Sequence, residues 1–150
     1  MKATKLSNEN KYNLLMGRVP LLLNRFLVKK FKDNDIYLTR EQWSILAVLW
    51  KNDGCSQQAL AEATYRDKPS ITRLIDNLEK EGYVERKADK NDRRLKLIFL
   101  TQKGRDIEIP MMNVVNETID IATKNLTEEQ TLNIRDSFQL IFENINKELS

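Results

Sequence analysis

The apolar residues of this chain mostly recur every three or four positions, which is the spacing of one face of an α-helix. Long stretches of this pattern lie at about 8–32 and 102–149, and shorter ones lie at about 40–51, 57–64 and 69–80. Four glycines and three prolines in 150 residues leave room for few turns. The pattern therefore predicts a mainly α-helical protein.

Prolines and capping residues divide these stretches. Pro20 lies inside the first long stretch and Pro110 inside the last. A proline inside a helix removes a backbone hydrogen bond and clashes with the preceding turn, so we expect both long helices to bend. The spacing of a capping box at residues 39–42 and again at 127–130 marks two further helix starts.

The two short helices at 57–64 and 69–80 are predicted to form a helix-turn-helix. Alanines at positions 59, 61 and 63 allow a second helix to pack closely against the first. In the second helix, the apolar residues form one stripe: Ile71, Leu74, Ile75 and Leu78. Arg73 lies almost opposite this stripe, and Asp67 can cap the helix start. The second helix therefore presents one arginine among short polar residues.

Two short strands should follow, because Tyr83–Lys87 and Leu95–Leu100 are rich in β-branched, aromatic and long apolar residues. Gly82 suits the end of the preceding helix. The connector Ala88–Arg94 is too polar to pack and too long for a tight turn, so it should project as a wing. Residues 86–96 hold six Lys/Arg against two Asp/Glu.

An outward polar helix beside a basic loop is what duplex DNA binding needs, because a helix can read base edges in the major groove. The basic loop can reach phosphates or the minor groove. The alternative is an ordinary α/β segment with a charged, solvated face, and for the helix alone that alternative would be favoured. The ordered combination of helix, strands and basic loop is more specific.

These features resemble the winged helix-turn-helix of the MarR family of bacterial transcription regulators. The residues that carry the resemblance are Pro69–Glu79 (PSITRLIDNLE), Gly82–Arg86 (GYVER), Asp92–Arg94 (DRR) and Leu100–Gly104 (LTQKG). The resemblance implies a mainly α fold with a small β-hairpin. It also implies a single domain over 1–150, with a winged-helix lobe at about 39–101 and dimerisation helices at about 8–32 and 102–149.

The expected function is sequence-specific binding of double-stranded DNA by a transcription regulator, with repression as the usual outcome in the family. The residues expected to bind DNA are Lys68, Pro69, Ser70, Thr72, Arg73, Asn77, Lys90, Arg93 and Arg94. Arg73 is the candidate for a base contact in the major groove, and Asp76 is expected to hold its guanidinium group. By resemblance, Arg94 should enter the minor groove, with Asp92 orienting the wing.

A homodimer on an inverted repeat is expected, because the terminal helices carry more apolar surface than the compact lobe can cover. The family also implies a small aromatic or phenolic ligand that releases DNA. Its candidate pocket is formed by Met16, Val19, Trp43, Leu46, Ile107 and Met111, although for each of them plain core is the favoured interpretation. Constitutive DNA binding without an effector is the alternative. A winged-helix protein–protein interaction module without specific DNA binding is the competing function.

Composition excludes several other classes of protein. The chain has no histidine, which argues against zinc or manganese sensing and against His-based catalysis. It also lacks a nucleophile–base pair and a glycine-rich phosphate loop, so neither an enzyme nor a cofactor is expected. Cys55 is the single cysteine, which rules out an internal disulfide, and the favoured interpretation is a small loop residue.

Charge and the first residues of the chain complete the picture. The net charge is +3, but residues 102–150 hold five Lys/Arg against nine Asp/Glu, so this acidic part should not face DNA. The first residues contain no apolar stretch typical of a signal peptide, and no transmembrane helix is expected. The sequence therefore predicts a cytoplasmic protein with no membrane partner.

Overall fold

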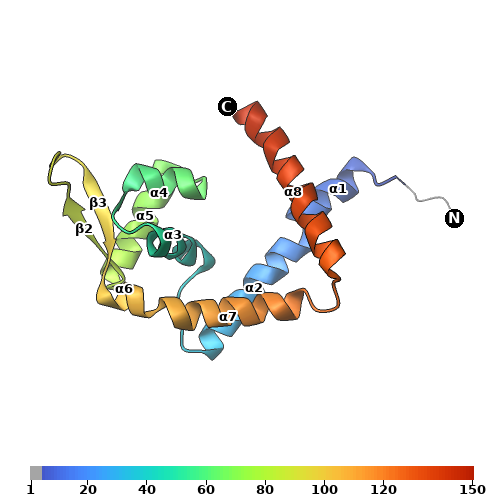
Figure 1. The fold of residues 1–150 in the computed structure, drawn as a ribbon, viewed down its shortest axis with the longest axis horizontal. Helices are drawn as coiled ribbons and strands as arrows, with labels where there is room; N and C mark the ends of the chain where they lie inside the picture. The colour runs from blue at the N-terminus through green and yellow to red at the C-terminus, as the bar shows by residue number, and fades with distance from the viewer. Residues whose placement is uncertain (1–4) are drawn as a thin grey trace. The chain divides into compact units, whose positions relative to one another are not determined.

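The computed structural model describes residues 5–150 as eight helices and three short strands (Figure 1). The elements, in chain order, are α1 (Asn8–Met16), α2 (Arg18–Asp33), α3 (Arg40–Lys51), β1 (Cys55–Ser56), α4 (Gln57–Thr64), α5 (Lys68–Lys80), β2 (Val84–Ala88), β3 (Lys96–Leu100), α6 (Gln102–Asp106), α7 (Glu108–Ala122) and α8 (Glu128–Leu149). They form two compact units, one up to Thr118 and the other from Ile119 to Ser150. The predicted mainly α fold with a β-hairpin is confirmed.

The sheet contains one strand more than the sequence suggested. β2 and β3 pair antiparallel as expected, with Arg86 opposite Ile98, and the hairpin extends beyond helices α4 and α5 (Figure 1). The two-residue strand β1 pairs with the other edge of β3, with Cys55 opposite Ile98. The expectation that Cys55 lies in a loop was therefore wrong. Two residues are too few to show a period-2 pattern, so this strand could not be predicted from the sequence.

Both predicted helix bends occur, and each helix breaks four residues before its proline. α1 ends at Met16, four residues before Pro20, and α6 ends at Asp106, four residues before Pro110. This is the position whose carbonyl group loses its hydrogen-bond donor and meets the pyrrolidine ring. Gly17 forms the junction between α1 and α2. The stretch 8–32 is therefore two helices, α1 and α2, and the stretch 102–149 is three, because α8 begins separately at its own capping box.

The helix ends follow their sequence signals. Capping boxes open α3 (Thr39 with Gln42) and α8 (Thr127 with Gln130), as predicted. α5 ends with Gly82 at φ +84°, while the backbone N–H of Gly82 and of Tyr83 donate to the carbonyl oxygens of Glu79 and Leu78. These bonds form a Schellman motif, which turns the chain from α5 into the hairpin.

The core lies in the first unit, where the helix-turn-helix packs on the sheet. Phe31 of α2 and Met111 of α7 are completely buried, together with Ile45, Leu46 and Leu49 of α3 and Ile71, Ile75 and Leu78 of α5. Gly104 closes this arrangement, because a Cβ atom there would lie 2.1 Å from the carbonyl oxygen of Tyr83. The indole N–H of Trp50 donates to the Gly104 carbonyl at 2.9 Å and so ties α3 to α6.

Helix α8 differs from the helices of the core, because none of its residues is buried. Its apolar residues include Phe138 at 52% exposure and Ile145 at 53%. The expectation that most apolar positions of the last helices are core holds in α7 for Met111, Val114 and Val115 but not for Ile119 and Ile121, which are exposed. It is wrong for α8, none of whose residues is buried. No helix in residues 5–150 is long and apolar enough to span a membrane.

Candidate nucleic-acid interface

Helix α5 has one buried side and one exposed side, as its sequence predicts. Ile71, Ile75 and Leu78 are completely buried. On the other side, Arg73 and Asn77 are exposed, and Lys68 and Pro69 are exposed in the first turn. The interior fixes the orientation of the helix, so the polar residues of its outer face point into solvent.

The start of α5 is held by Asp67. Its carboxylate accepts a hydrogen bond from the backbone N–H of Ser70 at 2.8 Å. This bond lowers the pKa of Asp67, and the nearby positive charge of Arg73 lowers it further. The charged carboxylate caps the helix and leaves the outer face of the first turn open.

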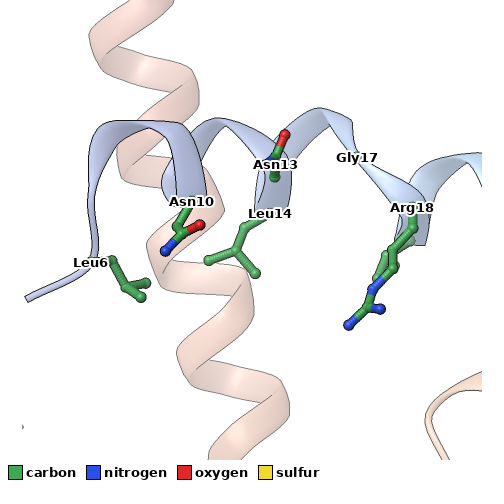
Figure 2. Close-up of a pocket in the computed structure, with 7 residues that line it drawn as sticks. Leu6, Asn10, Asn13, Leu14, Gly17 and Arg18 are labelled. Carbon is green, nitrogen blue, oxygen red and sulfur yellow. The ribbon is translucent and has the colours of Figure 1, made fainter. Parts of the chain in front are cut away.

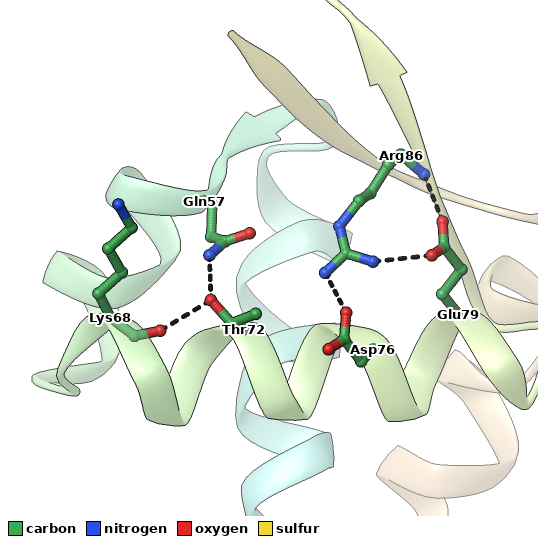
Figure 3. A network of polar contacts seen from close by, with 6 residues as sticks. All are labelled: Gln57, Lys68, Thr72, Asp76, Glu79 and Arg86. Carbon is green, nitrogen blue, oxygen red and sulfur yellow. Dashed lines mark hydrogen bonds and ion pairs between the residues drawn. The ribbon is translucent and has the colours of Figure 1, made fainter.

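The predicted DNA-binding side chain of Thr72 has internal partners, which Figure 3 shows. The Thr72 hydroxyl donates to the Lys68 carbonyl at 2.9 Å and accepts from the Gln57 side-chain amide at 2.5 Å. It therefore ties α5 to α4 and is only half exposed. This contact of Gln57 was not predicted from the sequence, although Gln57 is the first residue of the helix that packs against α5.

The expectation that Asp76 holds the guanidinium group of Arg73 is wrong. The Asp76 carboxylate accepts a hydrogen bond from Arg86 Nη2 at 2.5 Å instead. A second carboxylate, that of Glu79, accepts from Arg86 Nη1 at 2.7 Å. The expectation is corrected because the β2 strand brings a guanidinium group to Asp76, which the spacing within α5 alone could not reveal.

A hollow of about 240 Å³ opens beside the exposed side of α5. It is lined by Glu41, Arg66, Ser70, Arg73, Leu74 and Asn77. The hollow therefore brings together three of the predicted DNA-binding residues. Arg66 and Glu41 were missed, since the first lies in the turn before α5 and the second in α3, far away in sequence.

The wing presents its basic residues to solvent. Lys90, Arg93 and Arg94 are all exposed, and the Arg94 side chain is 93% exposed. The Asp92 carboxylate accepts from the backbone N–H of Arg94 at 3.1 Å and from its Nε at 3.3 Å. These bonds fix the turn that carries Arg94. Asp92 is therefore placed where an orienting residue of the wing would be needed.

The free positive charge of the hairpin is smaller than the sequence count suggests. Arg86 is paired with α5, and the Lys87 ammonium group lies 3.2 Å from the Glu85 carboxylate. Lys90, Arg93, Arg94 and Lys96 are exposed beyond them. The basic charge is thus concentrated at the tip of the wing, where contact with a nucleic acid backbone would be made.

The six residues proposed for a ligand pocket lie in different environments. Leu46 and Met111 are completely buried, and Trp43 and Ile107 pack against the core. Met16 is 67% exposed and Val19 is 64% exposed. The structure therefore separates two exposed members on α1 and α2 from four members in or against the core.

Cys55 is buried and its thiol donates to the Asn52 carbonyl at 2.8 Å. Burial raises the pKa of the thiol, and the negative charge of Asp53 raises it further. The thiol is therefore less reactive than a free one. Within residues 5–150, no group of three or more His, Cys, Asp or Glu side chains could hold a metal ion.

The fold and the exposed basic surfaces define a winged helix-turn-helix DNA-binding protein, and comparisons agree. The MarR family profile matches residues 38–96. The regulator FarR of Neisseria gonorrhoeae is 31% identical over 103 residues, which are 69% of this chain and 70% of FarR. The uncharacterized regulator YybA of Bacillus subtilis is 26% identical over 133 residues, which are 89% of this chain and 87% of YybA.

Solved structures extend the similarity to most of the chain. CouR of Rhodococcus jostii RHA1, solved with p-coumaroyl-CoA, aligns with a TM-score of 0.75 at 25% identity and covers 91% of this chain and 95% of CouR. The chain therefore belongs to the MarR family. It is a DNA-binding transcriptional regulator and not an enzyme. The resemblance inferred from its sequence motifs is confirmed.

Proposed function

We propose that this protein is a homodimeric repressor that recognises an inverted repeat in double-stranded DNA. The observation that carries the proposal is that two elements of the lobe each carry an exposed arginine: Arg73 on α5 and Arg94 on the wing. Each side chain faces solvent while its element is held by the core. As a DNA-binding regulator, the protein would act on the chromosome, in the cytoplasm.

Base recognition would come from the outer face of α5. An arginine forms two hydrogen bonds with guanine in the major groove, and asparagine can do the same with adenine. Arg73 and Asn77 share the hollow beside α5 with Ser70, which supports a common role for the three. Lys68 and Pro69 lie in the first turn, where contact with phosphates is expected. Thr72 would contribute by holding the helix.

The wing would supply affinity more than sequence information. The minor groove shows a degenerate pattern, so an inserted Arg94 would favour narrow A·T-rich segments. Lys90 and Arg93 would neutralise phosphates on either side of it. Asp92, which is bonded to Arg94, would keep that side chain directed out of the wing before DNA is bound.

Dimerisation would use the exposed apolar faces of the terminal helices. No residue of α1 or α8 is buried within the chain. An open hollow of about 620 Å³ follows α1, with Leu6, Asn10, Leu14 and Arg18 on the same side (Figure 2). A second copy would cover these surfaces, and pairing two lobes would place their half-sites about one helical turn, roughly 10 bp, apart.

A small aromatic or phenolic ligand would bind near α2 and α3 and weaken DNA binding. The indole nitrogen of Trp43 and the amide oxygen of Asn24 are buried without a hydrogen-bond partner in the described residues. Buried polar groups are normally paired, so a polar ligand group or water is needed there. That CouR was solved with an aromatic acyl-CoA supports this proposal.

Substitution of the two arginines tests DNA recognition. Arg73→Ala should cost roughly 1–3 kcal/mol on a selected duplex and relax base preference at one position in each half-site. Arg94→Ala should weaken selected and scrambled duplexes alike and lower the salt slope by about one per subunit. Binding of both variants would be measured at several salt concentrations, with Lys124→Ala as a charge-matched control outside the lobe.

The alternatives give different results. An equal loss of affinity on both duplexes for Arg73→Ala would make Arg73 a phosphate contact. If neither variant differed from Lys124→Ala, the surface would not bind DNA. The winged helix would then be a protein–protein interaction module, which is the competing function.

A further inference from the structure

Arg86 joins the wing to the recognition helix through three hydrogen bonds. Its Nη2 lies 2.5 Å from the Asp76 carboxylate and its Nη1 lies 2.7 Å from that of Glu79. The other Glu79 oxygen accepts the backbone N–H of Arg86 at 3.0 Å. Figure 3 shows the guanidinium group of Arg86 reaching from β2 across to both carboxylates on α5. The planar fork of an arginine suits such a double contact.

The position of Arg86 in β2 explains why it faces the helix. Side chains alternate across a strand, so Val84, Arg86 and Ala88 share one face and Glu85 and Lys87 the other. Val84 is buried on that first face, and the Arg86 side chain is only 22% exposed. Arg86 is therefore turned inward, and its charge is not offered to DNA in the way that those at the tip of the wing are.

The contact lies between the two proposed DNA-reading side chains. Asp76 is three residues beyond Arg73 on α5, and β2 leads directly into the wing that carries Arg94. A hairpin held to its sheet only at its base could swing relative to α5. The Arg86 contact removes that freedom, because it fixes the strand to the helix at two successive turns.

We propose that Arg86 is a positioning residue that fixes the wing relative to the recognition helix, so that Arg73 and Arg94 bind DNA as one unit. The proposal rests on the DNA contacts proposed above. Its physical basis is that a rigid pair of contacts loses less conformational freedom on binding than two independently mobile ones. Arg86 acts through Asp76 and Glu79 and does not itself touch DNA.

The sign of the effect at Glu79 separates this role from simple electrostatics. Removing a carboxylate near a DNA-binding surface should by itself raise affinity, because the phosphates are negative. If Glu79 holds Arg86, Glu79→Gln should instead lower affinity for a selected duplex by roughly tenfold, an effect typical of contacting charged groups. Glu85→Gln is the matched control, because Glu85 lies on the other face of β2 and pairs with Lys87.

A double-mutant cycle provides the readout that a merely structural role would not change. Arg94→Ala should cost several-fold more affinity in the parent than in Glu79→Gln, because in that variant the wing is no longer held. Arg86→Lys keeps the charge but loses the fork, so it should resemble Glu79→Gln and leave the salt slope unchanged. A lost phosphate contact would lower that slope by about one per subunit.

The outcomes are distinct, and thermal unfolding of each variant establishes that it is folded. If Glu79→Gln behaves like Glu85→Gln while Arg73→Ala and Arg94→Ala weaken binding, this proposal is overturned and the proposed function stands. A reduced salt slope in Arg86→Gln, with full affinity in Arg86→Lys, would make Arg86 a direct phosphate contact. If neither Arg73→Ala nor Arg94→Ala affects binding, the proposed function itself fails.

Discussion

The winged-helix lobe and helix α8 differ in whether their apolar residues are buried within the chain. In the lobe, residues 39–101, the large apolar residues of α3 and α5, with Val84 of β2 and with Ile98 and Leu100 of β3, are buried or packed against the core. α8 is longer than any helix of the lobe, yet none of its residues is buried. The same helical periodicity therefore marks a core in one region and a surface in the other.

This difference teaches that an apolar stripe predicts burial but not what covers it. The lobe has a sheet, a helix pair and a closing turn that all meet, whereas α8 belongs to a separate unit. The lobe should therefore owe its stability to contacts within the chain. α8 and α1 should owe theirs to a second chain, so their stability should depend on protein concentration.

The largest effect should come from the core of the lobe. Ile75→Ala removes a completely buried side chain from α5 and should lower the free energy of unfolding by about 2–5 kcal/mol. Urea unfolding would measure this loss, which should be the same at low and high protein concentration. Lys80→Ala, on the exposed side of the same helix, should change stability by less than about 0.5 kcal/mol.

A charge on α8 should act on assembly instead. Phe138→Asp places a carboxylate on a side chain that is 52% exposed in the single chain, so the monomer should keep its fold. Loss of an apolar anchor from a dimer should cost about 2 kcal/mol or more. Sedimentation would then show a weaker dimer, with Gln139→Asp as the neighbouring control. An unchanged dimer would remove α8 from the proposed interface.

The two capping boxes provide a smaller version of the same comparison. Thr39→Ala and Thr127→Ala each remove a cap worth about 1 kcal/mol, and Thr→Ser at either position should retain it. We expect Thr39→Ala to lower the melting temperature at every protein concentration. Thr127→Ala should lower it mainly in dilute samples, where the dimer dissociates. Identical concentration dependence in both variants would contradict the claim that α8, unlike the lobe, is stabilised by a second chain.

The smallest effect should be at Cys55. Because the folded thiol has a raised pKa, less of it is thiolate at neutral pH, and labelling should stay slow until the pH exceeds the ordinary value for cysteine. Cys55→Ser should leave DNA binding and its response to peroxide unchanged, since a serine hydroxyl can also donate to the Asn52 carbonyl. Peroxide-triggered release that disappears in the variant would show a redox switch.

Local signals explain how much of the fold was predictable. The capping boxes, the Asp67 cap, the Gly82 stop and the two prolines act within a few residues, and the structure places each helix boundary beside them. The hairpin was predicted to within one residue at each strand because its wing is a long polar insertion. These features depend on backbone chemistry that a short sequence window contains.

What the sequence did not reveal depends on contacts between distant residues. Asp76 was assigned to Arg73 because they are neighbours on a helix, but β2 brings Arg86 to it from ten positions away. Arg86 was counted as part of the basic wing, although the alternation with buried Val84 could have placed it inward. The strand β1 and the half-buried Thr72 likewise depend on packing that periodicity cannot supply.

The most direct test of the account is selection of bound duplexes from a random pool by the full-length protein. If each lobe reads one half-site and the terminal helices pair two lobes, the recovered sequences should contain an inverted repeat with half-sites roughly 10 bp apart. Phe138→Asp, selected in parallel at low concentration, should recover single half-sites or nothing. A single, asymmetric site recovered by both proteins, or no enrichment with either, would contradict the account.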